Sequence, residues 1–331
     1  MIISKTPFRI SFFGGGTDYP PYFREHGGSV LATSIDKYCY ISCRHLPPFF
    51  DHKFRIAYSK IENAKSINDI HHPAVRGVLK QFGVEQGLEI HHDGDLPARS
   101  GLGSSSSFVV GLVNALNALS GKFSPKMTLA KEAINIEQNV LKEAVGSQDQ
   151  VSAAFGGLNR IDFHEDDTFS VRPIILGSDR KSLLDENLLL FFTGITRFAS
   201  LVAKKKVDNF GEKKRELQQM KDMVSQGIEI LGDRSCPLSE FGELLHQAWM
   251  YKRELAQGIT SSEIDAVYDA ALAAGAVGGK LLGAGGGGFI LFYVEESSRK
   301  SVIDALAPLV HVPFRFESDG STIAVYQPEA S

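Results

Sequence analysis

A segment rich in glycine and serine, residues 97–107, carries the clearest chemical signal in the sequence. It follows a strand-like run that ends at His92 and precedes an apolar run, residues 108–119, with the composition of a helix. A glycine-rich turn that opens a helix presents unpaired backbone N–H groups at the positive end of the helix dipole, where phosphate binds readily. Because the Gly-Lys-Ser/Thr of a Walker A loop is missing, the segment predicts either a different phosphate loop or a serine-rich helix cap.

Two acidic residues further along the chain suit the chemistry of a phosphate site. Glu137 lies at helical spacing from Ala133 and Leu141, on an otherwise apolar stripe of a helix predicted over residues 128–144. A carboxylate on such a face is either part of a structural ion pair or a metal ligand. Asp149 follows in a polar turn just past that helix. Together they suit one Mg²⁺ ligand and one general base.

Two more glycine clusters frame these residues. Arg9 lies in an apolar strand-like run that ends in the glycines 14–16, so its charge faces either solvent or a site. Asp18, just beyond these glycines, is placed to accept hydrogen bonds from substrate hydroxyls. The other cluster, residues 283–288, has apolar flanks. A linker usually has polar surroundings, so we favour a backbone surface packed against the site, with a linker as the alternative.

The elements that must position these residues alternate irregularly between strands and helices. Such a mixture without strict βαβ alternation predicts an α+β fold, with a domain boundary near residue 180. Strands are expected at 8–13, 38–44, 54–58, 88–92, 158–163, 170–175, 187–193 and 289–294, and near 312 and 322; helices are expected at 108–119, 128–144, 201–231, 239–257 and 262–274, and near 297–309.

Composition narrows the function classes. The net charge of −4 gives no case for binding nucleic acid or an anionic membrane surface. The three cysteines form no CxxC pair, the N-terminus has no signal peptide, and no apolar run approaches the roughly 18 residues of a membrane span. We therefore expect a cytoplasmic protein with reduced thiols; the oligomeric state stays open, a homo-oligomer included. The adjacent histidines at 71–72 and 91–92 diverge in direction and make poor metal chelates.

The order of the three glycine motifs along the chain resembles the signature of the GHMP kinase superfamily, and it spans residues 7–289. This resemblance implies a two-domain α+β fold: an N-terminal ATP-binding domain like domain 2 of ribosomal protein S5 over 1–180, and a ferredoxin-like C-terminal domain over 181–331. It also implies ATP and Mg²⁺ as cofactors and an active site between the domains.

The resemblance further implies a role for each motif residue. Asp149 would take the proton of the acceptor hydroxyl, with Arg9 beside it, and Mg²⁺ would bind Glu137 with Ser104 or Ser105. The ATP phosphates would bind Pro97, Arg99, Ser100, Gly101, Leu102, Gly103, Ser104, Ser105 and Ser106. The sugar would bind Gly16, Thr17, Asp18, Arg197, Gly285 and Gly286.

Within the superfamily, the first motif, residues 7–19, departs from the Gly-Glu-His of galactokinase. It looks like the first motif of the heptose 7-phosphate kinase branch, and the segment 193–197 is also similar to that branch. That branch phosphorylates the anomeric hydroxyl of its sugar phosphate, on the GDP-heptose route to surface glycans. A substrate phosphate needs a cationic pocket, for which Arg24, Arg197 and Lys204 are candidates, with ordinary surface charge as the alternative. A fucokinase-like enzyme, an ATP-dependent decarboxylase and a non-catalytic sugar sensor are the competing hypotheses.

Overall fold

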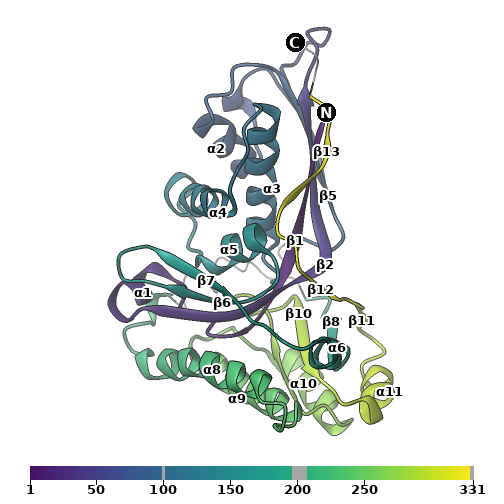
Figure 1. The fold of residues 1–331 in the computed structure, drawn as a ribbon. Helices are drawn as coiled ribbons and strands as arrows, with labels where there is room; N and C mark the ends of the chain where they lie inside the picture. The colour runs from purple at the N-terminus through teal and green to yellow at the C-terminus, as the bar shows by residue number, and fades with distance from the viewer. Residues whose placement is uncertain (99–100, 196–206, 329–331) are drawn as a thin grey trace.

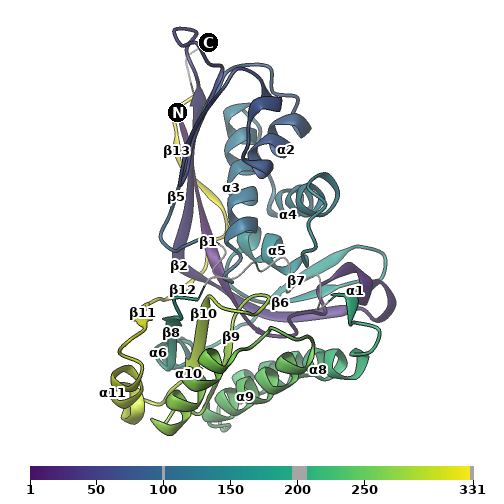
Figure 2. The ribbon, with the colours of Figure 1, turned by 180° about the vertical axis from the view of Figure 1, so that it is seen from behind.

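Two sheets with helices packed against them form the protein, as the computed structural model shows for residues 1–98, 101–195 and 207–328 (Figure 1). The mixture confirms the predicted α+β fold. In the described part of the chain, the first sheet has nine strands, and helices α2 to α5 cover one of its faces (Figures 1 and 2). The second sheet has four strands and lies at the other end of the molecule with α8 to α11 (Figure 1).

The first sheet has the order β13-β1-β2-β5-β3-β4, with β6 and β12 also pairing with β2, and β7 with β6. Its strands are β1 Ile2–Phe13, β2 Gly28–His45, β3 Phe54–Ala57, β4 Ile61–Ala64, β5 Leu88–Gly94, β6 Leu158–Phe163, β7 Phe169–Pro173, β12 Phe316–Glu317 and β13 Thr322–Tyr326. The helices of this part are α1 Pro20–His26, α2 Pro73–Gln81, α3 Ser104–Leu119, α4 Lys126–Asn135 and α5 Gln148–Phe155, with a 3-10 turn η1 Ile67–Asp69 and a π-helical turn η2 Ile136–Val140.

The second sheet has the order β11-β8-β10-β9, and its described pairs are all antiparallel. Its strands are β8 Leu188–Phe192, β9 Gly278–Leu281, β10 Phe289–Tyr293 and β11 Val310–His311. The helices of this part are α6 Ser178–Glu186, α8 Lys214–Gly232, α9 Ser239–Glu254, α10 Ser262–Ala273 and α11 Glu296–Ala305. No helix in the described residues is both long and apolar enough to cross a membrane.

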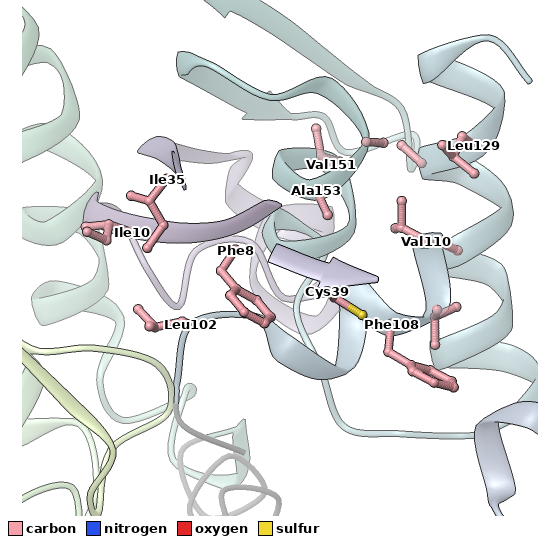
Figure 3. Close-up of a cluster of buried hydrophobic side chains, with 14 of the residues drawn as sticks. Phe8, Ile10, Ile35, Cys39, Leu102, Phe108, Val110, Leu129, Val151 and Ala153 are labelled. Atoms are coloured by element: carbon pink, nitrogen blue, oxygen red, sulfur yellow. The ribbon is translucent and has the colours of Figure 1, made fainter. Parts of the chain in front are cut away.

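Helix α3 is the centre of the larger core. It is buried from Ser106 to Ala118 because β1 and β2 pack on one side and α4 and α5 on the other. Figure 3 shows the apolar side chains that meet there, among them Phe8 of β1, Val110 of α3, Leu129 of α4 and Val151 of α5. A helix that is apolar nearly all round is stable only in such a fully enclosed position. Its first turn is thereby fixed against the end of β1.

Strand β1 is buried on both faces from Thr6 to Phe13. Helices α3 and α5 of the first part contact β1, and so do helices α8 and α9 of the second part. Helices from both parts therefore enclose this strand. The alternation of polar and apolar residues in this run therefore does not mark a solvated face. Arg9 lies inside the protein, and the solvent-facing alternative for it is wrong.

Four local expectations differ from the observed elements. The helix predicted over 201–231 is interrupted, because α8 begins at Lys214 after turns at 209–212; residues 201–206 lie outside the described residues. The predicted helix 128–144 is α4, which ends at Asn135 and continues as the π-helical turn η2. Asp149 does not lie in a turn but in the first turn of α5, and α3 begins at Ser104, four residues before the apolar run. Each difference comes from tertiary packing that extends or interrupts a helix beyond its local apolar pattern.

The end of the chain returns to the first sheet. Strand β13 pairs with β1 and β12 pairs with β2, so the strands expected near 312 and 322 fall in different sheets. The division at residue 180 stays a prediction, and the pairing adds that the last strands cross back to the N-terminal half.

Candidate active site

Arg9 and Asp149 form a bidentate ion pair at the centre of the site. Nε of Arg9 donates to Oδ1 of Asp149 at 2.8 Å, and a second guanidinium nitrogen donates to Oδ2 at 2.9 Å. The Arg9 side chain is 4% exposed and that of Asp149 is 26% exposed. The pair therefore fixes the carboxylate from the buried side and leaves part of it open, which is the geometry that an approaching hydroxyl requires.

The phosphate-loop segment lies directly on this pair. The third guanidinium nitrogen of Arg9 donates to the carbonyl of Gly101 at 2.9 Å. The backbone N–H of Arg9 donates to the carbonyl of Leu102 at 3.2 Å. A Cβ on Gly103 would lie 3.4 Å from both Arg9 and Asp149. Because Gly103 also has a φ of +75°, only glycine fits this position without strain. The N-terminus of α3 thus opens beside the ion pair.

Glu137 is fully buried on the π-helical turn, next to the start of α3. Its Oε2 accepts hydrogen bonds from Ser106 Oγ at 2.7 Å and from Gln150 Nε2. Burial, with smaller contributions from the charges of Glu143 and Asp149, raises its pKa to about 8, and the two hydrogen bonds partly oppose this increase. Its other oxygen, Oε1, has no hydrogen-bond partner among the described residues.

These donors fit a Mg²⁺ ion. A buried carboxylate oxygen without a partner is what a cation would satisfy, and a metal would also favour the ionised form of Glu137. Among the described residues there is no group of three or more His, Cys, Asp or Glu side chains that would hold a metal alone. Magnesium in nucleotide sites typically takes one or two protein ligands and completes its shell with phosphate and water. Ser106 of α3 contacts Glu137 directly, and Ser104 and Ser105 as metal ligands stay predictions.

The third glycine cluster is packed against the phosphate loop, so the linker alternative is wrong. A Cβ on Gly283 would lie 2.4 Å from Cα of Gly101, and one on Gly101 would lie 2.9 Å from the carbonyl oxygen of Leu282. Two glycines therefore allow two backbones to meet directly. The amides of Gly286 and Gly288 bond to the carbonyls of Ile259 and Ile195 at 2.8 Å each, which holds the rest of the cluster in place.

Two buried lysines tie this cluster to the rest of the site. Lys252 of α9 donates to the carbonyls of Leu281 and Gly283 at 2.6 and 2.7 Å. Lys280 of β9 donates to the carbonyl of Phe12 in β1 at 2.6 Å and so joins the two halves of the molecule. The sequence gives no periodic or motif signal for Lys252. For Lys280 the signal is its position three residues before the glycine cluster.

The residues expected to bind sugar are placed unequally. Thr17 is fully buried, and its hydroxyl donates to the carbonyls of Gly14 and Ser29, so it holds the turn and faces no open site. Asp18 is also buried and accepts backbone amides. Gly16, Gly285 and Gly286 have positive φ angles and lie in the loops that flank the site.

Some expected residues cannot be placed at the site. Arg99, Ser100, Arg197 and Lys204 lie outside the described residues. Pro97 is exposed before the loop. Arg24 forms an exposed ion pair with Asp167 at 2.7 Å. This contact supports ordinary surface charge for Arg24 rather than a phosphate pocket.

Both halves of the chain are similar to domains of known proteins. Residues 69–157 match the N-terminal domain of the GHMP kinases, and residues 237–309 match the GHMP kinase C-terminal domain. The chain is also 30% identical to a D-glycero-alpha-D-manno-heptose 7-phosphate kinase from Campylobacter jejuni, over 92% of this chain and 93% of the relative. The chain belongs to the GHMP kinase family.

Two further relatives of this GHMP kinase are named as sugar or sugar-phosphate kinases. A crystal structure of a D-glycero-D-manno-heptose 1-phosphate kinase from Bacteroides thetaiotaomicron superposes with a TM-score of 0.80 and 25% identity, covering 99% of this chain and all of the other. A bifunctional fucokinase/GDP-fucose pyrophosphorylase from Arabidopsis thaliana is 24% identical over 89% of this chain, which spans 30% of that larger protein. The GHMP kinase described here is thus an ATP-dependent phosphotransferase of the sugar-kinase kind.

Proposed function

We propose that this enzyme transfers the γ-phosphoryl group of ATP to the anomeric hydroxyl of D-glycero-D-manno-heptose 7-phosphate and forms the 1,7-bisphosphate. The arrangement that carries the proposal is the Arg9–Asp149 pair, which is held against the glycine loop and leaves the carboxylate partly open. The relative from Campylobacter jejuni, 30% identical over nearly its whole length, supports the choice of sugar. A cytoplasmic location and a place on the GDP-heptose route are part of this proposal.

The residues would contribute to the reaction in two ways, by positioning the reacting groups and by neutralising the charge of the phosphates. The backbone N–H groups at the start of α3 bind the phosphates of ATP, helped by the helix dipole. Asp149 accepts the hydrogen of the attacking hydroxyl and orients its oxygen toward the γ-phosphorus, while Arg9 keeps the carboxylate in place. Glu137, with Ser106 or the serines before it, would hold Mg²⁺, which neutralises phosphate charge when bound. Gly16, Gly285, Gly286 and Arg197 remain proposed contacts for the sugar phosphate.

An acceptor screen tests the proposal. ADP release is measured with purified enzyme, ATP and Mg²⁺ against heptose 7-phosphate, heptose 1-phosphate, fucose, mannose, galactose and mevalonate. Both heptose phosphates are needed because the names of the two heptose-kinase relatives place the phosphate on different carbons. We expect the highest kcat/KM with heptose 7-phosphate, and phosphorus NMR of the product should show a second phosphate at the anomeric carbon.

The other outcomes identify the competing hypotheses. Preference for fucose would support the fucokinase-like alternative, for which the Arabidopsis thaliana relative is the observation. Release of CO₂ from mevalonate diphosphate would indicate the decarboxylase, and binding of sugar without ADP release would indicate a sensor. Any of these results would contradict the heptose 7-phosphate proposal.

A further inference from the structure

Asp18 hydrogen-bonds to the backbone at the start of α5, the helix that carries Asp149. Its side chain follows the first glycine motif and is 1% exposed. Oδ1 accepts the backbone N–H of Gly16 at 2.8 Å, and Oδ2 accepts that of Gln148 at 3.4 Å. Its backbone carbonyl accepts the N–H of Ser147 at 2.9 Å. Asp18 therefore accepts hydrogen bonds from two consecutive backbone amides at the start of α5, and Asp149 is the next residue.

Helix α5 needs an acceptor at this end. Its N-cap residue, Ser147, makes no capping hydrogen bond with its own side chain within the described structure, and its hydroxyl instead accepts from Gln138 at 3.0 Å. The first N–H groups of a helix have no partner inside the helix, and a carboxylate beside them stabilises the helix. Asp18 supplies that acceptor from 130 residues away in the sequence.

The fit between Asp18 and this turn leaves no spare room. A Cβ on Gly146 would lie 1.9 Å from Oδ2 of Asp18 and 3.1 Å from the ring of Tyr19. Tyr19 is also buried and hydrogen-bonds to the backbone of Gly146. The first motif thus holds the residues before Asp149 by close packing as well as by hydrogen bonds.

We propose that Asp18 is a positioning residue that fixes the first turn of α5 so that the Asp149 carboxylate faces Arg9. The first motif then holds Asp149 from two sides: Arg9 binds its carboxylate, and Asp18 binds the backbone that carries it. Displacements near 1 Å in such a constellation lower turnover strongly. This inference rests on the proposed phosphoryl-transfer role of Asp149, and it is an alternative to the expectation that Asp18 binds a sugar hydroxyl.

Two variants separate the positioning role from a sugar contact. Asp18→Asn keeps the size of the side chain but lets an NH₂ group face the amide of Gln148. Gly146→Ala keeps the carboxylate and displaces it. For both we expect kcat to fall 10- to 100-fold while KM for the acceptor and for ATP changes less than about threefold. Gly232→Ala is the control, since no atom lies within 4 Å of its added Cβ, and it should match the parent enzyme.

A second measurement needs no substrate. Hydrogen exchange of the backbone amides at 147–150 should become faster in both variants, while the amides of α9 keep their rates. The kinetic arm uses whichever acceptor the screen identifies, so failure of the heptose proposal leaves this test intact. A rise of tenfold or more in acceptor KM with unchanged kcat would overturn the positioning role in favour of a sugar contact. Unchanged exchange at 147–150 would overturn it as well, even for a variant too inactive for kinetics.

Discussion

Two buried ionisable side chains at the site, Arg9 and Glu137, differ in their partners. Arg9 is enclosed by helices on both faces of β1 and directs all its side-chain nitrogens to Asp149 and Gly101. Glu137 has no cationic partner within the described part of the chain, and burial raises the pKa of its carboxyl. The ion pair and the lone acid lie on either side of the start of α3. The proposed function therefore assigns the carboxylate of Asp149 to the acceptor hydroxyl and that of Glu137 to the metal.

Asp149→Asn tests the first of these carboxylates. We expect kcat to fall at least 100-fold while ATP still binds, because the amide cannot accept the hydroxyl proton. The variant should also lose stability on the order of 2 kcal/mol, since the buried Arg9 charge loses its counterion. Turnover is measured by ADP release, and ATP affinity by calorimetry.

The matched control for Asp149→Asn is Asp304→Asn, which removes the acid of the exposed pair between Lys300 and Asp304. Exposed pairs of this kind contribute little, so its turnover and unfolding midpoint should stay unchanged. Near-normal turnover of Asp149→Asn would contradict the catalytic role of Asp149.

At the scale of elements, the site is built where three loops and one helix start meet. The phosphate loop rests on Arg9, the third glycine cluster rests on the phosphate loop, and the first motif holds α5. The contact between Gly101 and Gly283 is made by backbone alone, which lets elements from the two halves of the chain approach more closely than side chains would permit.

Gly283→Ala should separate these two loops. Its Cβ would lie 2.4 Å from Cα of Gly101, so the phosphate loop must move, and we expect kcat/KM for ATP to fall at least tenfold. Gly121→Ala is the control because the φ angles match, +70° at Gly121 and +67° at Gly283, and no atom lies within 4 Å of its added Cβ. That variant should lose about 1 kcal/mol of stability and no activity. Equal ATP kinetics in the two variants would refute the role of the contact.

Across the whole molecule, helix α5 is held at both ends by distant parts of the chain. Asp18 binds its N-terminus, while the amide of Ser321 bonds to the carbonyl of Ala153 at 2.8 Å near its C-terminus. The carbonyl of Glu317 likewise accepts the N–H of Gly157 at 3.1 Å. Residues 317–321 therefore belong to the framework that carries Asp149, although they lie far from it in the sequence.

Gly320→Ala is expected to loosen this framework. Its Cβ would lie 2.2 Å from the carbonyl oxygen of Ala154, so the C-terminal segment must shift away from α5. We expect the thermal unfolding midpoint to fall by several degrees and turnover to decrease, with differential scanning calorimetry and ADP release as the measurements. Gly232→Ala, which adds a Cβ in open space on α8, should be neutral or slightly stabilising. A Gly320→Ala enzyme that unfolds like the parent would contradict the proposed support of α5.

The sequence by itself determined the family, the α+β class and the residues of the three motifs. These signals are local: glycines at fixed spacing, an acid on an apolar stripe, and runs with strand or helix composition. Only the tertiary structure decided that Ser106 hydrogen-bonds to Glu137 and that Asp18 hydrogen-bonds to the start of α5. It also decided that β13 pairs with β1. The physical reason is that these contacts join segments far apart in sequence, and that the Asp18 contact and the strand pairing use backbone groups, which every residue carries and no side-chain pattern reveals.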